Sequence, residues 1–338
     1  MTSTSSFNWQ QAISALAGRQ LLVIGDVMLD EYVSGDARRV CPEAPVPVVE
    51  AMERWAVPGG AANAAANAAA LGGRVILGGA TGDDHAAREF ARTAQATNVN
   101  PAGLVADRTR PTTTKLRVLA RGQQVIRVDT ESVAALSPAA ALQLAEWAER
   151  AAREADAVLL SDYGKGVVDA ALAERVISSA RRANRPVVVD PKGRDASRYR
   201  GATIVKPNLS ELADLAGRAV RTAADIVEAG ERVANELVGT AILVTRGSEG
   251  MALFRAGERA LLLPAAPARR VYDVTGAGDT AAATLALGLA AGLPLEIAAR
   301  LANAAAGLAV CKVGTSVVTP AELIDALLEA APEFQPLS

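Results

Sequence analysis

Short, nearly continuous apolar segments recur along the chain and alternate with longer stretches rich in alanine and leucine. The short segments are typical of strands that are buried on both faces of a sheet. We expect such strands at residues 20–25, 74–80, 157–161, 186–190, 202–206 and 241–245. The longer stretches predict helices, among them residues 139–152, 170–183, 281–291, 295–312 and 320–331. This alternation predicts an α/β fold with a central, mostly parallel sheet.

Two segments break this pattern and predict a smaller piece of β-structure. Residues 33–50 carry prolines at positions 42, 45 and 47, which exclude a helix or a central strand and favour an edge strand in VPVVE, residues 46–50. Residues 112–119 and 124–129 alternate apolar or β-branched residues with polar ones, and Arg121-Gly122-Gln123 joins them as a hairpin. We therefore expect a projecting flap, with segments at about 33–50 and 112–129, on a single domain that spans residues 1–338.

Composition narrows the class of protein. Half of the residues are hydrophobic but only 3% are aromatic, so a large core must be built from Ala, Val, Leu and Ile. The net charge of −2 and the pI of about 5.7 give no electrostatic case for nucleic acid or an anionic membrane as partner. Cys41 and Cys311 lie far apart in the sequence. The first residues do not resemble a signal peptide, and no apolar run is typical of a membrane-spanning helix. We expect a cytoplasmic protein.

Polar residues gather where the predicted strands end. Asp26 follows the first strand, Lys165 follows the strand at 157–161, and Asp190 and Lys192 follow the strand at 186–190. The carboxyl ends of parallel strands meet at one edge of the sheet, where open α/β sheets bind ligands. Asp26 could instead cap a turn, and the two lysines could be ordinary loop charges in water. Their shared position makes the lysines candidates for phosphate contacts.

The string DVTGAGDT, residues 273–280, predicts an anion site at the start of a helix. Gly276 and Gly278 bracket Ala277, so backbone N–H groups can point into open space. If the helix begins at about Gly276, its unpaired N–H groups and its dipole face the same space. Asp279 would then be placed to take a proton from a hydroxyl beside a phosphate. The alternative is a glycine turn with Asp279 as a helix-terminal charge, since the string is neither a Walker A loop nor a dinucleotide fingerprint.

An alanine-rich helix is predicted after a turn at Gly59 and Gly60, and it carries two asparagines. Asn63 and Asn67 lie one turn apart on the same face of this helix. Asparagine is a weak helix former, so the pair points either to a ligand site or to packing against a neighbouring backbone.

Asn208 and Glu211 lie three residues apart at the start of a later helix. They match an N-cap with its capping-box partner, and the same spacing lets both side chains face one site. His85 is the only histidine and has no partner motif, so we expect it at the surface. That expectation removes histidine-dependent catalytic triads from consideration.

The strings DVTGAGDT and GGAANAA (residues 59–65) resemble the signatures of the ribokinase-like, or pfkB, carbohydrate kinases. The resemblance covers about residues 21–328. It implies a three-layer α/β/α sandwich with a small β-sheet lid over the sugar, a homodimer formed through that lid, and ATP and Mg²⁺ as cofactors, with a monovalent cation as a further candidate. In the family the loop backbone at Gly276, Ala277 and Gly278 stabilises the moving phosphoryl group, and Asp279 is the general base.

The same resemblance assigns the remaining site residues. The sugar side is expected to include Asp26, Asp30, Gly59, Gly60 and Asn63, whereas Asn67 is expected to be structural. The nucleotide side is expected to include Asn208, Ser210, Glu211, Thr245, Gly247, Thr275 and Asn303, with Glu211 as the residue that organises the metal. VGTSVVTP, residues 313–320, resembles the family's adenine-side and monovalent-cation loop.

Three longer strings narrow the resemblance to the branch of the family that phosphorylates heptose 7-phosphate: GDVMLDEY, CPEAPVPVVE and SDYGKG…DPKG…YRGATIVKPNLSE. This implies transfer of the γ-phosphate of ATP to the anomeric hydroxyl of D-glycero-β-D-manno-heptose 7-phosphate, a step of lipopolysaccharide biosynthesis. Residues expected to neutralise the sugar phosphate are Lys192 and Arg117, followed by Arg38 or Lys165, and Lys115 is a further candidate on the hairpin. Asp190 is expected among the residues that bind the substrate.

One further prediction concerns domain organisation, and two alternatives to this reading stay open. Many kinases of this branch are fused to a nucleotidyltransferase, and the lack of an HxGH-type motif here predicts a stand-alone kinase. The acceptor could be a fructose phosphate, ribose or a nucleoside. A non-catalytic sugar- or nucleotide-binding protein is disfavoured because the glycine loop and Asp279 are both intact.

Overall fold

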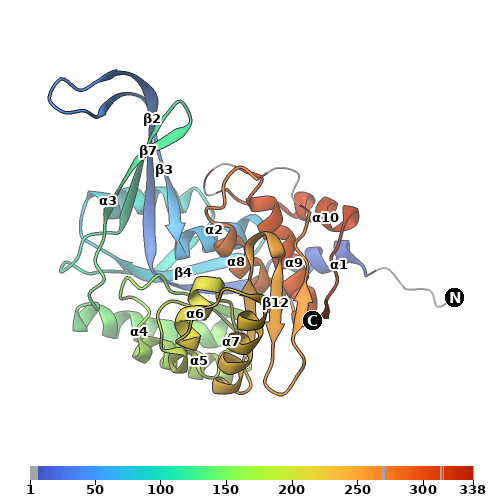
Figure 1. Cartoon of the computed structure of the whole chain (residues 1–338). Helices are drawn as coiled ribbons and strands as arrows, with labels where there is room; N and C mark the ends of the chain where they lie inside the picture. Colours follow the sequence, from blue (N-terminus) through green and yellow to red (C-terminus); the bar gives the residue numbers. More distant parts are fainter. Residues whose placement is uncertain (1–6, 268–270, 313, 315, 338) are drawn as a thin grey trace.

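The structure, a computed structural model, describes residues 7–267, 271–312, 314 and 316–337. These residues form a large sheet with helices on both faces and a smaller sheet that projects from the main body (Figure 1). The central sheet is mostly parallel, as the alternating pattern predicted. Among the described helices, none combines the length and the apolar character needed to cross a membrane.

The large sheet has ten strands in the order β14-β13-β12-β11-β10-β9-β8-β1-β4-β5. The strands from β11 to β5 pair in parallel, and β12, β13 and β14 add an antiparallel edge. The strand bounds are β1 Gln20–Gly25, β4 Arg74–Thr81, β5 Asn100–Ala106, β8 Ala157–Ser161, β9 Val187–Asp190, β10 Ile204–Val205, β11 Ala241–Thr245, β12 Met251–Phe254, β13 Leu261–Leu263 and β14 Gln335–Pro336.

Each central strand is buried on both faces. In β1, Leu22 and Ile24 pack into one apolar cluster while Leu21 and Val23 pack into the other, because successive side chains of a strand point to opposite faces. The cluster on the first face includes residues of α4 Pro138–Glu154, α5 Ala170–Arg182, α6 Leu209–Ala216 and α7 Ala223–Glu236. The cluster on the second includes residues of α1 Trp9–Ser14, α2 Ala61–Ala70, α3 His85–Gln95, α8 Ala277–Ala290, α9 Leu295–Ala309 and α10 Pro320–Glu329.

The small sheet consists of β2 Val27–Val40, β3 Pro47–Gly60, β6 Thr114–Ala120 and β7 Gln123–Thr130, in the order β3-β2-β6-β7. Pro47 begins the edge strand β3, where its missing N–H costs no ladder bond. The hairpin between β6 and β7 turns at Arg121 and Gly122, both with positive φ. Figure 1 shows this sheet rising from the body as an arm.

Two expectations about local structure are wrong. Gly59 and Gly60 do not form a turn, because they pair with Met28 and Val27 as the last residues of β3. Glycine is required there by close packing: a Cβ on Gly59 would lie 2.4 Å from Oδ2 of Asp30. The strand expected at 202–206 is only Ile204–Val205, and β5, α1 and α7 are elements that the sequence pattern did not single out.

Candidate active site

The carboxyl ends of four neighbouring strands and the start of α8 enclose one cavity of about 190 Å³. The strands are β8, β9, β10 and β11, so residues far apart in sequence meet at a single edge of the sheet. The lining residues are Asp162, Tyr163, Asp190, Lys192, Lys206, Asn208, Glu211, Thr245, Gly276, Gly278 and Asp279.

The start of α8 has the geometry of an anion site. Gly276 is the N-cap and adopts a left-handed conformation with φ 81°, which only glycine takes at little cost. Its position leaves the first N–H groups of the helix without a side-chain cap. Gly278 is exposed and lines the cavity, so no side chain covers the backbone at this point. The helix begins at Ala277, close to the position expected from the sequence.

Asp279 lies in the first turn of α8, and both of its carboxylate oxygens are held by other elements. Asn63 Nδ2, on α2, donates to Oδ2 over 2.7 Å. The hydroxyl of Tyr163, in the loop after β8, donates to Oδ1. Only 6% of Asp279 is exposed, and burial raises its pKa above the ordinary aspartate value. A carboxylate with a raised pKa, directed at a cavity beside free N–H groups, is suited to accept a proton from a bound hydroxyl.

A buried ion pair lies next to this carboxylate. Lys206 is only 2% exposed, and its Nζ lies 3.0 Å from Oδ1 of Asp190. Burial raises the pKa of Asp190 to about 7, and the nearby carboxylates of Glu211 and Asp279 act in the same direction. The ammonium group of Lys206 opposes this rise. Lys206 therefore supplies a fixed positive charge at the cavity wall, close to Gly278.

Asn208 and Glu211 form the capping box expected at the start of α6. The Asn208 side chain accepts from Glu211 N over 2.9 Å, and Glu211 Oε2 accepts from Asn208 N over 3.0 Å. The other oxygen, Oε1, lies 3.2 Å from Nζ of Lys192. Lys192 thus lies beside the residues expected at the nucleotide, and its expected contact with the sugar phosphate stays a prediction. Ser210 is an exposed residue of the same helix.

Asp26 is buried, and its carboxylate accepts hydrogen bonds from the backbone of the loop after β8. Its Oδ2 accepts from the N–H groups of Tyr163 over 2.7 Å and Lys165 over 3.2 Å. Its Oδ1 accepts from Val167 N over 3.1 Å. Three backbone bonds make Asp26 an anchor of this loop, in addition to any sugar contact that the sequence resemblance implies.

Asp30 and Arg117 join the small sheet by a largely buried ion pair. Nη1 of Arg117 lies 2.6 Å from Oδ1 of Asp30, and its guanidinium lies over the ring of Tyr32. The close contact between Gly59 and Asp30 places the GG pair of the GGAANAA string against this carboxylate. The paired glycines thus admit Asp30 beside the β3 backbone, a contact that any larger side chain would block.

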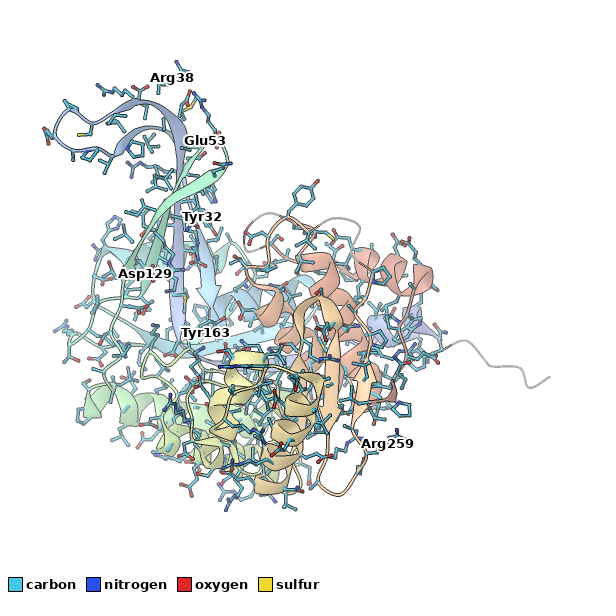
Figure 2. The ribbon with its side chains drawn as sticks, in the orientation of Figure 1. Tyr32, Arg38, Glu53, Asp129, Tyr163 and Arg259 are labelled. Carbon is cyan, nitrogen blue, oxygen red and sulfur yellow. The ribbon has the colours of Figure 1, made fainter. Side chains whose placement is uncertain are left out.

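The remaining cationic candidates lie in two different places. Lys165 and Lys115 both contact Glu131, at 2.6 Å and 3.3 Å, so they form one cluster near the base of the hairpin. Arg38 instead lies at the outer end of the arm, far from Tyr163 (Figure 2), where it pairs with Asp36. Arg38 therefore cannot clamp a phosphate at the cavity of its own chain.

The remaining nucleotide-side candidates are spread over several elements. Thr245 lines the cavity and forms an isolated parallel bridge with Asn208. Gly247 lies just after β11 with φ 59°, and Thr275 N donates to Asp273. Asn303 is buried in α9, where its side chain donates to the carbonyl of Pro264. In the expected adenine-side loop, residues 313 and 315 lie outside the described part of the chain.

Residues 19–322 match the family described as pfkB family carbohydrate kinases. The chain belongs to this family. It is an ATP-dependent sugar kinase, and its fold is shared by solved sugar kinases. One of these is a ribokinase of Arabidopsis thaliana complexed with ribose and ATP, with a TM-score of 0.72 and 25% identity over 92% of this chain and 99% of that one. Another is the tetrameric inhibited form of phosphofructokinase-2 from Escherichia coli, with a TM-score of 0.75 and 22% identity over 93% of this chain and 99% of that one.

Curated relatives are more similar in sequence than these solved structures. The bifunctional protein HldE of Azorhizobium caulinodans is 48% identical over 317 residues, which cover 94% of this chain and 66% of that protein. The chain thus spans a little under two thirds of the length of the relative. The family match covers the glycine loop, the two asparagines on α2 and the capping box on α6.

Sequence reasoning missed two residues of the site, and only Lys206 carried a signal that could have revealed it. Tyr163 was part of the polar loop after β8, but nothing in its spacing indicated a contact with Asp279, 116 residues away. Lys206 ends the apolar segment IVK, and a lysine that closes a buried strand is itself unusual, because lysine is rarely buried without a partner. That anomaly was the available signal for the Asp190 pair.

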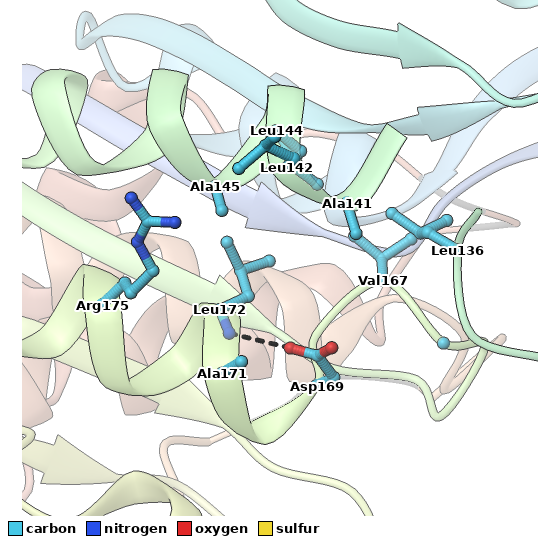
Figure 3. A pocket seen from close by; sticks show the side chains of 11 residues that line it. Leu136, Ala141, Leu142, Leu144, Ala145, Val167, Asp169, Ala171, Leu172 and Arg175 are labelled. Carbon is cyan, nitrogen blue, oxygen red and sulfur yellow. Dashed lines mark hydrogen bonds between the residues drawn. The ribbon is translucent and has the colours of Figure 1, made fainter. Parts of the chain in front are cut away.

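A second cavity, of about 180 Å³, lies between α4 and α5 (Figure 3). Its wall is mainly apolar, with Leu142, Leu144 and Leu172 among the lining side chains. Asp169 at its edge accepts from Leu172 N over 2.7 Å as the N-cap of α5. None of the expected site residues lines this cavity, so the predicted chemistry gathers at the sheet edge instead.

Proposed function

We propose that this chain transfers the γ-phosphoryl group of ATP to the anomeric hydroxyl of D-glycero-β-D-manno-heptose 7-phosphate, giving the 1,7-bisphosphate. The geometry of Asp279, buried beside the uncapped start of α8, carries the proposed phosphoryl transfer. The heptose acceptor is supported by the three strings at residues 25–32, 41–50 and 161–211, and by the 48% identity to a bifunctional HldE protein. The proposal concerns the kinase reaction alone.

The proposed reaction is an in-line displacement. Asp279 accepts the proton of the anomeric O–H as that oxygen forms a bond to the γ-phosphorus. The bond from the γ-phosphorus to the oxygen it shares with the β-phosphate breaks, and ADP leaves with that oxygen. The ammonium of Lys206 and the uncapped start of α8 at Gly276 and Gly278 border the space in which negative charge would spread over the phosphoryl oxygens. The N–H group of Ala277 is already bound to the carbonyl of Val274, so the other N–H groups of this first turn would serve the phosphoryl group.

Magnesium would enter with the nucleotide. Mg²⁺ commonly uses one or two carboxylates together with phosphate oxygens and water, so a dedicated cage is not required. Within the described residues, no group of three or more His, Cys, Asp or Glu side chains is arranged to hold a metal ion. Glu211 fits the smaller requirement, since it lines the cavity and only its Oε2 is used by the capping box. The ion would take the place of the Lys192 ammonium at Oε1. We propose Glu211 as the residue that orients this ion, which neutralises phosphate charge when bound.

The 7-phosphate of the sugar would be held by cations at the base of the small sheet. Arg117, Lys115 and Lys165 lie there, each already paired with a carboxylate. A phosphate that replaces one carboxylate in these pairs brings about two negative charges in place of one and leaves no cation unpaired. This arrangement favours a phosphorylated acceptor over ribose or a nucleoside.

A homodimer through the small sheet is part of the proposal. Its strands expose apolar side chains, including Met52 at 77% and Ile126 at 53%. An exposed apolar face of this kind is typical of an interaction surface. Sedimentation velocity of the wild type and of Ile126→Lys tests this point, with a shift toward monomer expected for the variant. A monovalent cation near residues 313–320 and a cytoplasmic location are likewise proposed from the family resemblance.

The acceptor is tested by measuring ADP release with Mg–ATP against heptose 7-phosphate, fructose 6-phosphate, ribose and adenosine. We expect turnover with the heptose phosphate to exceed that of the others by about 100-fold or more, because the phosphate clamp and the sugar contacts act together. Asp279→Asn serves as the matched variant and should lose turnover while it still binds nucleotide. A preference for ribose or adenosine would reject the heptose assignment and leave the kinase reaction in place.

A further inference from the structure

The loop after β8 is fixed to the body of the protein at alternate residues. Asp26 accepts the N–H groups of residues 163, 165 and 167, so one buried carboxylate holds the loop along its length. Arg110, which is 8% exposed, donates to the carbonyl of Lys165 from the opposite side. The same guanidinium also donates to the carbonyl of Ser132, beyond the end of β7. Few surface loops are held by two buried charged side chains, which indicates that the position of this loop matters.

The loop backbone has little room to move. Gly166 adopts φ 86°, and a Cβ at this position would lie 2.1 Å from the carbonyl oxygen of Ala134. Lys165 Nζ adds a contact of 2.6 Å to Glu131. A loop constrained in this way presents the side chain of Tyr163, its second residue, in a defined direction.

Tyr163 directs its hydroxyl to the carboxylate of Asp279. The hydroxyl donates to Oδ1, while Asn63 donates to Oδ2, so the carboxylate is fixed by one donor on each oxygen. Desolvation and the neighbouring carboxylates raise the pKa of Tyr163 well above its ordinary value, so the hydroxyl remains a proton donor. The other charged groups that act on Asp279 are Lys206 and Asp30, and Asp190 lies in the same cavity.

We propose that Tyr163 is a positioning residue for the reaction: its hydroxyl fixes the orientation of the Asp279 carboxylate and stabilises the charged form of that carboxylate. Asp26 acts through Tyr163, because it holds the loop that carries this tyrosine. Each carboxylate oxygen has two lone pairs, so Asp279 can accept the proton of the sugar hydroxyl while Tyr163 and Asn63 stay bound. The sequence resemblance assigned Asp26 to sugar hydroxyls, whereas its three backbone bonds assign it to the loop. This inference rests on the proposed role of Asp279 as the base.

The test is the pH profile of kcat for Tyr163→Phe, measured with Mg–ATP and heptose 7-phosphate. The Tyr163 hydrogen bond lowers the pKa of Asp279, so its removal should move the acidic limb of the profile upward by about one pH unit. Near neutral pH we expect kcat to fall by up to about 10-fold, because a shift of one pH unit lowers the ionised fraction of Asp279 by no more than that. Most of the loss should be recovered at alkaline pH, with KM for ATP little changed. Asp190 lies in the same cavity and its pKa depends on the charge of Asp279, so the profile is also compared in the Asp190→Asn background. A limb that still moves there on Tyr163→Phe belongs to Asp279.

Tyr199→Phe is the matched control. Its hydroxyl donates to Asp162 over 2.7 Å, so this variant also loses a tyrosine–aspartate hydrogen bond, but not one to the base. We expect Tyr199→Phe to lower thermal stability without moving the acidic limb. An unchanged profile for Tyr163→Phe, or a loss of kcat that is equal at every pH, would overturn the inference.

Two further variants separate this inference from the proposed function. If Asp279→Asn keeps wild-type turnover, the role of Asp279 as base fails, and the role of Tyr163 fails with it. If Asp279→Asn is inactive while Tyr163→Phe behaves as the wild type, only the positioning role fails. Asp26→Asn should reproduce the shifted acidic limb if Asp26 anchors the loop, whereas a sugar contact alone would raise KM for the sugar and leave the limb in place.

Discussion

Asn63 and Asp279 are separated by 216 positions in the chain, yet Nδ2 of Asn63 donates to Oδ2 of Asp279 over 2.7 Å. Each is the third residue of its helix, Asn63 on α2 and Asp279 on α8. The two strings that identify the family in the sequence therefore meet at one hydrogen bond. An asparagine in an alanine-rich helix, unfavourable by propensity, is explained by this contact.

Asn63→Ala should lower kcat about 10-fold or more, because the variant removes one of two donors that stabilise the charged form of Asp279. The Asn63 hydrogen bond lowers the pKa of Asp279, so the acidic limb of the pH–rate profile should also move upward. Steady-state kinetics from acid to alkaline pH measures both effects.

Asn67→Ala is the control for that variant, one helical turn away. Asn67 accepts from the Thr280 hydroxyl over 3.0 Å and donates to the backbone carbonyl and, over 3.2 Å, to the side-chain oxygen of Asn63. It therefore joins α2 to α8 and contacts the Asn63 amide, but it makes no contact with the base itself. We expect a loss of about 1–3 kcal/mol in the free energy of unfolding and an unshifted acidic limb. A shifted limb for Asn67→Ala with none for Asn63→Ala would contradict the assignment of roles.

Gly278→Ala should separate activity from stability. A Cβ at Gly278 would meet only Nζ of Lys206, at 3.9 Å, so the folded structure accommodates it, and replacing glycine within a helix favours folding by about 0.5–1 kcal/mol. The methyl group nevertheless enters the space proposed for the transferred phosphate. We expect a large loss of kcat with unchanged or slightly higher thermal stability.

Gly288→Ala, on the same helix, should have the reverse effect. A Cβ there would lie 2.9 Å from the Cβ of Ala298, so α8 and α9 would have to separate. We expect a loss of about 1–3 kcal/mol in stability, with kcat near the wild-type value in the fraction that remains folded. Full activity in Gly278→Ala would argue against an anion site at this helix terminus.

Much of the fold follows from pattern alone because its core strands are buried on both faces. Segments such as β1 and β8 are short, apolar and bounded by polar residues, and their observed bounds match the predicted ones. β10 was harder to predict, since Lys206 ends its apolar segment: its N–H still donates to Val189 of β9 over 2.8 Å, while its side chain pairs with Asp190. Gly59 and Gly60 looked like a turn, because sequence spacing does not reveal that Asp30 packs against their backbone.

The candidate site divides in a similar way. The helix start at Gly276 and the capping box at Asn208 each depend on residues a few positions apart in the chain, so the sequence predicts them. The contact of Tyr163 with Asp279 depends on how the loop after β8 crosses the start of α8, which no local pattern encodes. The backbone bonds of Asp26 to residues 163–167 are long-range for the same reason.

Lys206→Met should destabilise the protein strongly. The variant leaves the Asp190 carboxyl buried without its cation, and breaking a buried pair typically costs about 3–5 kcal/mol. Denaturant unfolding at neutral pH measures the loss. Adding Asp190→Asn to Lys206→Met should restore part of the stability, because the uncompensated charge is removed. If the double variant loses more free energy of unfolding than the two single variants lose together, the two side chains do not stabilise the fold as a pair.

The stability contribution of Asp190 should depend on pH in a defined direction. Burial raises the pKa of this carboxyl to about 7 in the folded protein, above its ordinary value of 3.8. A raised carboxyl pKa favours the folded state at low pH, and this contribution is lost as the pH rises through about 7. The stability of the wild type should therefore fall relative to Asp190→Asn between about pH 4 and about pH 8.

Asp107 provides the opposite control, because the N–H groups of Ser137 and Thr109 help to lower its pKa to about 2. Its contribution is present above the ordinary pKa and is lost as the pH falls toward about 2. The stability of the wild type relative to Asp107→Asn should therefore fall on acidification. Equal slopes for the Asp190 and Asp107 variants would contradict the assigned environments.

The central claim is that phosphate is placed on the anomeric oxygen of a heptose that already carries a phosphate. The most direct test incubates the protein with Mg–ATP and D-glycero-β-D-manno-heptose 7-phosphate and determines the product by ³¹P and ¹³C NMR. The account predicts a second phosphorus coupled to C1, with the phosphate on C7 retained and one ADP formed per product. Phosphorylation of a different hydroxyl, or no product while another sugar is turned over, would contradict it.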